Sequence, residues 1–203
     1  VNGLGLVSKD GTFTHVSLDG PLTNVFPSPD GDILIGLVDQ TTCPDDEDAI
    51  LITDCDEPET STQLVAIVDG LVINATTLEQ PFNAISWNET GTNAIAYIDS
   101  NLGDVSGNGV VSLTTVLVIT PADSTITPVQ VGFSASEVLF HPETNRAVVL
   151  SQSEVAVIDL AANPPATVVT YPLTLDPDDV VNPVGISLTP DGGSALISAH
   201  GTD

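Results

Sequence analysis

The chain has 203 residues and a formal net charge of −26, because 28 acidic residues stand against only two basic ones. Lys9 and Arg146 cannot form a basic patch, which argues against binding to nucleic acids or to anionic membrane surfaces. A hydrophobic content of 41% argues against global disorder, and no run approaches the ~20 apolar residues of a transmembrane helix.

The first 20 residues predict two strands, over residues 3–7 and 12–18, with a turn at residues 9–11 between them. The pair corresponds to the outer half of the repeating unit that the rest of the chain contains.

Residues 40–61 form an acidic insert in which Cys43 and Cys55 bracket most of the charge. Two cysteines cannot complete a zinc site, and their spacing is not that of a CxxC redox motif. A disulfide that pins this loop is one interpretation, and it implies an extracellular, cell-surface or periplasmic location. Two unlinked thiols are the alternative. Asp45, Asp46 and Asp48 are candidate Ca²⁺ ligands, or members of a solvated acidic loop.

Two triplets fit the N-glycosylation sequon, one at Asn74 and one at Asn88. Such triplets are common by chance. They matter only if the source of the protein glycosylates them.

Residues 100–112 form a second insert. Its segment 104–109 (DVSGNG) is similar to the start of an EF-hand or dockerin-type calcium loop, with oxygen-bearing side chains at positions 1, 3 and 5 and glycine at position 6. Thr115 stands at position 12, where the motif requires an acidic residue. A hairpin without metal is therefore the alternative. The candidate ligands are Asp99, Asn101, Asp104, Ser106, Asn108 and Val110.

Four segments of the chain repeat one pattern, at residues 25–35, 85–97, 138–149 and 186–197. Each has a short apolar strand, a turn of Pro, Asp or Glu, Thr and Gly or Asn, and a second apolar strand. The corresponding turn positions are separated by 60, 53 and 48 residues, and they are Asp30, Thr90, Glu143 and Asp191. A second pair of β-branched strands follows the first three segments, within residues 63–73, 115–131 and 154–171.

Four strands in about fifty residues are typical of a β-propeller blade. We therefore predict an all-β fold, a β-propeller of four-stranded antiparallel blades that forms a partial ring of about three full blades and two half blades. Pairing of the two ends to close a four-bladed ring is the alternative. The expected boundaries are 1–20 (outer half), 21–78, 80–131, 134–173 and 183–203 (inner half).

The hairpins resemble those of the YVTN and WD40-like propeller repeats. The resemblance rests on residues 26–31 (FPSPDG) and 188–192 (LTPDG), and on the third-strand endings at Asp69 and Asp159. It implies a propeller fold. It does not imply one activity, because these families include binding scaffolds, surface proteins and some enzymes.

The sequence contains no GxSxG elbow, HExxH helix, Walker loop or GxGxxG motif. We expect His141 and His200 to be structural. The expectation is a non-catalytic extracellular or cell-envelope propeller that serves structure, protein binding or assembly, with Ca²⁺ in its acidic loops as an option. One alternative is a propeller hydrolase or lactonase with a metal in the central channel. Another is a self-associating surface or fibre protein. Four residues are expected at equivalent positions of the repeat, in the core between blades: Phe26, Trp87, Phe140 and Leu188.

Overall fold

A computed structural model describes residues 2–8, 10–42, 59–99, 102, 112–174, 181–190 and 194–201. The chain divides into two compact units, one over residues 1–81 and one that begins at residue 82. Every sheet is antiparallel and its strands follow chain order. No helix in the described part of the chain is long and apolar enough to span a bilayer.

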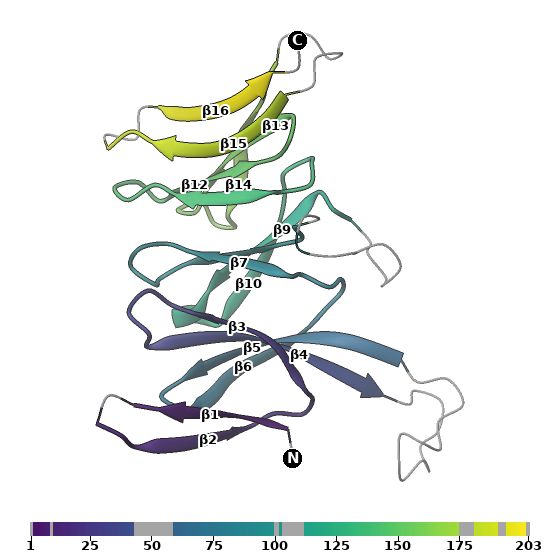
Figure 1. The fold of residues 1–203 in the computed structure, drawn as a ribbon, viewed down its shortest axis with the longest axis vertical. Coiled ribbons are helices and arrows are strands. Elements are labelled where there is room, and N and C mark those ends of the chain that lie inside the picture. The colour runs from purple at the N-terminus through teal and green to yellow at the C-terminus, as the bar shows by residue number, and fades with distance from the viewer. Residues whose placement is uncertain are drawn as a thin grey trace. The chain divides into compact units, whose positions relative to one another are not determined.

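The first unit contains one two-stranded and one four-stranded sheet (Figure 1). The two-stranded sheet consists of β1 (Gly3–Val7) and β2 (Phe13–Ser17). The four-stranded sheet consists of β3 (Leu22–Pro27), β4 (Ile33–Thr42), β5 (Glu59–Val68) and β6 (Leu71–Leu78).

The second unit contains two four-stranded sheets and a two-stranded one. The first has β7 (Ala84–Trp87), β8 (Ala94–Tyr97), β9 (Thr115–Thr120) and β10 (Thr125–Gln130), with a 3-10 turn at Pro121–Asp123 between the last two. The next has β11 (Glu137–Phe140), β12 (Arg146–Leu150), β13 (Glu154–Asp159) and β14 (Ala166–Pro172). The last has β15 (Val181–Leu188) and β16 (Ala195–Gly201). The predicted fold class, with three complete and two half blades, is confirmed.

The side chains of a strand point alternately to the two faces of its sheet, and this explains how successive sheets stack. On β12, Ala147 and Val149 face the sheet β7–β10, whereas Val148 and Leu150 face β15 and β16. Successive side chains of a strand point to opposite faces, so a strand buried on both faces is apolar throughout. The continuous apolar run of β12 is therefore the signature of a sheet packed between two others.

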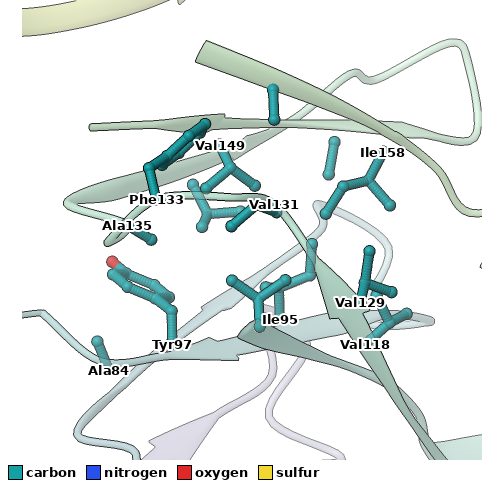
Figure 2. Close-up of a cluster of buried hydrophobic side chains, with 14 residues drawn as sticks. Ala84, Ile95, Tyr97, Val118, Val129, Val131, Phe133, Ala135, Val149 and Ile158 are labelled. Atoms are coloured by element: carbon teal, nitrogen blue, oxygen red, sulfur yellow. The ribbon is translucent and has the colours of Figure 1, made fainter. Parts of the chain in front are cut away.

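The core between β7–β10 and β11–β14 is the largest cluster in the second unit. Figure 2 shows Ile95 and Val118 pointing from one sheet toward Val149 and Ile158 of the next. The first strand β11 contacts the first strands β7 and β15, and the last strands β10 and β14 also touch. In this unit, strands with the same position in their sheets thus lie beside one another, as in a propeller.

In the first unit, β1 and β2 pack one face on the sheet β3–β6. Leu4, Leu6 and Val16 form that face, and they meet Val38 and Ile67.

Four of the sheets contain a turn that joins a first strand to a second strand. The same backbone hydrogen bond closes this turn in each of them. A backbone N–H donates to the carbonyl five residues further on, and the residue that donates is polar. The pairs are Ser28 with Ile33 (2.8 Å), Asn88 with Asn93 (3.0 Å), His141 with Arg146 (2.9 Å) and Thr189 with Ser194 (2.9 Å).

The strand registers correct one expected equivalence. Trp87 pairs with Ala94 and Phe140 with Ala147, but the residue in this place on β3 is Pro27, which pairs with Leu34. Phe26 is one position earlier, so it points to the other face of its sheet. The aromatic residue of β3 thus lies one residue further from its turn than Trp87 does from its own.

Candidate functional site

A cleft in the first unit lies where three turns meet. It has a volume of about 790 Å³, and its rim comes from the turns β1–β2, β3–β4 and β5–β6. Four carboxylates line it: Asp10, Asp30, Asp32 and Asp69. Its other lining residues are Leu6, Val7, Ser8, Thr12, Thr14, Gly31, Leu34, Ile67 and Gly70.

Asp10 and Asp30 close their own turns. The carboxylate of Asp10 accepts hydrogen bonds from the Ser8 hydroxyl and from the backbone N–H of Thr12, the latter at 2.9 Å. These bonds, that from Ser8 first, lower the pKa of Asp10 to about 2. A bond from the Ser28 hydroxyl, followed by one from the Asp32 backbone, likewise lowers the pKa of Asp30. Both groups are therefore anionic at neutral pH.

The turn between β5 and β6 brings Asp69 to the rim. Asp69 has a φ of 51° and Gly70 a φ of 77°, the left-handed pair that a two-residue hairpin requires. A Cβ on Gly70 would lie 2.6 Å from Cγ2 of Thr14, so this turn packs directly against β2. Glycine is needed here both for its backbone conformation and for the close approach.

The arrangement combines an anionic rim with an apolar floor formed by Leu6, Leu34 and Ile67. Carboxylates at the mouth of a cleft attract cations and hydroxyl groups and repel anionic ligands. Across the described residues, no group of three or more His, Cys, Asp or Glu side chains is arranged to hold a metal ion. The carboxylate rim therefore suits a ligand that is cationic or rich in hydroxyl groups.

Of the predicted calcium ligands, only Asp99 lies within the described residues. It is buried at the end of β8, where its backbone N–H donates to Oδ1 of Asn83 at 2.8 Å and its carbonyl accepts from Nδ2 at 2.9 Å. Ten predicted site residues lie outside the described residues: Cys43, Asp45, Asp46, Asp48, Cys55, Asn101, Asp104, Ser106, Asn108 and Val110. Most of each expected insert lies there too.

The two sequon asparagines occupy different settings. Asn74 is half-buried on the outer strand β6. Asn88 begins the turn between β7 and β8, and its side-chain amide donates to the hydroxyls of Thr90 (3.0 Å) and Thr92 (2.8 Å). Its Oδ1 accepts from the backbone N–H of Asn93 at 3.0 Å.

His141 is buried in its turn, where Nδ1 accepts from the backbone N–H groups of Glu143 (3.1 Å) and Thr144 (2.9 Å). Nε2 is also buried, with no hydrogen-bond partner. These bonds give His141 a turn-closing function. The side chain of His200 is outside the described part.

The cleft itself was missed from the sequence. Its signal is the recurrence of Asp-Gly in the three turns, at residues 10–11, 30–31 and 69–70. A turn signal alone does not show which turns come together, because that depends on how β1 and β2 pack on β3–β6.

The fold is similar to that of two solved enzymes. Hydrazine synthase of Kuenenia stuttgartiensis aligns over 98% of this chain and 49% of its own, with a TM-score of 0.52 and 15% identity. The dihydro-heme d1 dehydrogenase NirN aligns over 98% of this chain and 38% of its own, with a TM-score of 0.54 and 14% identity. The chain thus spans half or less of either protein. No family model and no curated protein matches it.

These comparisons correct the main functional expectation. A non-catalytic module was expected because the sequence has no familiar catalytic motif. The same fold carries a dehydrogenase in NirN and a synthase in the K. stuttgartiensis protein. One fold can carry different activities, which depend on the site and not on a contiguous sequence motif, so the missing motif does not make the domain non-catalytic.

Proposed function

We propose that this chain forms part of a propeller enzyme, and that its chemistry is hydrolytic, on lactones or related esters. The observation that supports an enzyme is the likeness to two enzymes over 98% of the chain. The side chains of the cleft support hydrolysis as the reaction class. Carboxylates and hydroxyl groups line the cleft, and hydrolysis needs a base for water and a place for a hydroxylated substrate.

Within the cleft, Asp32 and Asp69 are the proposed functional carboxylates. Asp10 and Asp30 are committed to their turns by the hydrogen bonds described above. Asp69 lies on a turn held against β2, and it faces the cleft beside Ile67. A carboxylate next to an apolar floor can orient a water molecule or a substrate hydroxyl while the rest of the ligand covers the floor.

A divalent cation, with Ca²⁺ first, is part of the proposal. Its candidate ligands are the two acidic inserts, and Asp99 marks where the second insert leaves β8. Membership of the YVTN and WD40-like repeat family is proposed on the hairpins at residues 26–31 and 188–192. An extracellular, cell-surface or periplasmic location is proposed on the disulfide that Cys43 and Cys55 are proposed to form.

The test is proton release from a sugar lactone and from an uncharged aryl ester, followed in a pH-stat with Ca²⁺ or with EDTA. We expect turnover of at least one substrate in the presence of Ca²⁺, and the EDTA arm tests whether the cation proposed for the inserts is required. We also expect Asp69→Asn to lower kcat/KM by a factor of about 100, as for loss of a general base. Asp123→Asn, an exposed position in the 3-10 turn, is the control and should leave the rate unchanged. Absence of turnover on both substrates, or equal rates for both variants, would contradict the proposal.

A further inference from the structure

The outer edge of β6 is open in a sheet that has all four of its strands. The strand order of this sheet is β3–β4–β5–β6, and among the described residues no further strand pairs with β6. The open edge therefore belongs to a complete sheet. An edge of this kind presents a row of backbone N–H and C=O groups that can pair with a strand from another chain.

The three complete sheets differ in how the edge of the fourth strand is protected. Proline has no N–H to donate, so it keeps an edge strand from pairing further. The fourth strand β10 contains Pro128, and the fourth strand β14 contains Pro172. The fourth strand β6 has the sequence LVINATTL, with neither proline nor a charged residue. Of the three, only β6 has the composition of a strand that can accept a further neighbour.

A bulge at Ile73 divides β6 into two parts. Val72 pairs with Ile67 and Asn74 with Ala66, so Ile73 has no counterpart on β5. After the bulge, residues 74–78 pair one to one with residues 62–66. This second part of β6 is a regular strand, which is the geometry that strand addition requires.

The first part of β6 exposes three consecutive apolar side chains. Leu71 is 69% exposed, Val72 40% and Ile73 44%. Contiguous apolar side chains on an open strand edge are a feature of interaction surfaces. The two parts of β6 thus offer different contacts, apolar side chains before the bulge and a regular backbone edge after it.

The charge of the protein selects the kind of chain that can pair with β6. The charged residues nearest to the strand in sequence are Asp69 before it and Glu79 after it, and Glu79 is exposed. A second copy of this chain would bring another net charge of −26 to the same edge, and like charges at an interface repel. A segment that is basic at its ends and apolar in its middle would instead meet opposite charge at both ends and apolar side chains between them.

We propose that β6 is the docking edge for an extended segment of a partner protein, basic at its ends and apolar in its middle, which adds a fifth strand to the sheet β3–β6. Backbone hydrogen bonds along residues 75–78 provide affinity, and Leu71, Val72 and Ile73 contact the apolar side chains of the segment. The eight residues of β6 span about 26 Å at ~3.3 Å per residue, so the segment needs about ten residues to reach both flanking carboxylates. The proposal does not rest on the proposed activity, since it is tested by binding alone.

The first measurement is a selection from a phage-displayed library of random peptides about ten residues long. The unmodified chain is the bait, and peptides that also bind the Ile73→Lys chain are removed. We expect enriched peptides with β-branched or aromatic residues in the middle and Lys or Arg toward the ends. Failure to enrich any peptide, or enrichment of peptides without an excess of basic residues, would overturn the proposal.

The second measurement compares two lysine substitutions, with the most enriched peptide as a labelled probe in fluorescence anisotropy. Ile73→Lys should weaken binding at least ~10-fold, because it places a positive charge on the docking edge and removes an apolar contact. Val168→Lys is the matched control, since Val168 occupies the corresponding bulge of β14, is 57% exposed and undergoes the same change of charge. It should leave the affinity unchanged. Equal weakening by both lysines would assign the effect to net charge alone and overturn docking at β6.

Hydrogen exchange with and without the same peptide locates its binding site. We expect slower exchange in β6, at residues 71–78, and unchanged exchange in β10, at residues 125–130. Protection confined to the turns at residues 8–12 and 28–32 would place the peptide in the cleft, and would overturn strand addition at β6.

Discussion

The ring of Phe13 lies across Gly5 on the neighbouring strand, so closely that a Cβ on Gly5 would be 2.9 Å from Cε2 of the ring. His15 covers Gly3 in the same way, at 2.5 Å from Nε2. Aromatic side chains that cover glycines on a paired strand hold the strands together where glycine offers no side chain. On the exposed face of β1–β2, the rings of Phe13 and His15 thus cover the backbone of β1 at its glycines.

Alanine at Gly5 and at Gly20 should have different effects. At Gly5 the neighbouring atoms belong to the tip of a side chain, which can move. At Gly20 a Cβ would be 1.9 Å from the carbonyl oxygen of Asp39, which is backbone. We expect Gly20→Ala to lower the free energy of unfolding by about 3 kcal/mol, and Gly5→Ala by less than about 1 kcal/mol. Urea unfolding measures both, and a loss of less than about 1 kcal/mol for Gly20→Ala would contradict the close packing of Gly20 against Asp39.

The core between β7–β10 and β11–β14 should depend strongly on Ile158, which is fully buried between the two sheets. Ile158→Ala removes the side chain and leaves a cavity, so we expect a loss of about 2–5 kcal/mol in the free energy of unfolding. Val168→Ala is the control on the adjacent strand, at a residue 57% exposed, with an expected change within about 0.5 kcal/mol. A small effect at Ile158 would contradict the face-to-face packing in Figure 2.

Much of this fold could be predicted from the sequence because its signals are local. Runs of β-branched residues between Gly, Pro, Asn and Asp define most of the strands, and the recurring turn shows that they form equivalent sheets. The position of individual residues within a repeat was harder to predict from the sequence. Residue type assigns Phe26 to the repeat position of Trp87, whereas distance from the turn assigns Pro27 to it.

The cleft could not be predicted for a different reason. It requires the turns that contain Asp10, Asp30 and Asp69 to meet, and their sequence separations carry no information about that. What brings them together is the packing of Leu4 and Leu6 on Ile67 and its neighbours. This is a contact between sheets, and it becomes visible only when the sheets are assembled.

The pH dependence of stability should reveal the turn at Asp10. Its pKa is lowered from 3.8 to about 2 in the folded protein, so the ionised carboxylate stabilises the fold above about pH 4. This contribution is lost as the pH falls through the folded pKa. We expect Asp10→Asn to be less stable than the unmodified chain at pH 7 and to approach it near pH 2, by urea unfolding at each pH. Asp32→Asn is the control, and an Asp10→Asn deficit independent of pH would contradict this explanation.

Asn88 should matter for stability whether or not it is glycosylated. Asn88→Ala removes the acceptor of the Asn93 N–H and the donor to Thr90 and Thr92, so we expect a loss of about 1–2 kcal/mol. Asn88→Asp keeps the acceptor and should lose less. Thermal unfolding of protein made without glycosylation measures both. The same loss for Asp and Ala would show that the bond to Asn93 contributes little.

Peptide-level hydrogen exchange tests most directly whether the sheets stack face to face, with β12 inside the stack. The comparison is between the interior strand β12, at residues 146–150, and the edge strand β6, at residues 71–78. We predict slow exchange in β12, because it is paired on both sides and covered on both faces, and faster exchange in β6, which is paired on one side. Exchange in β12 as fast as in β6 would contradict the stacked sheets.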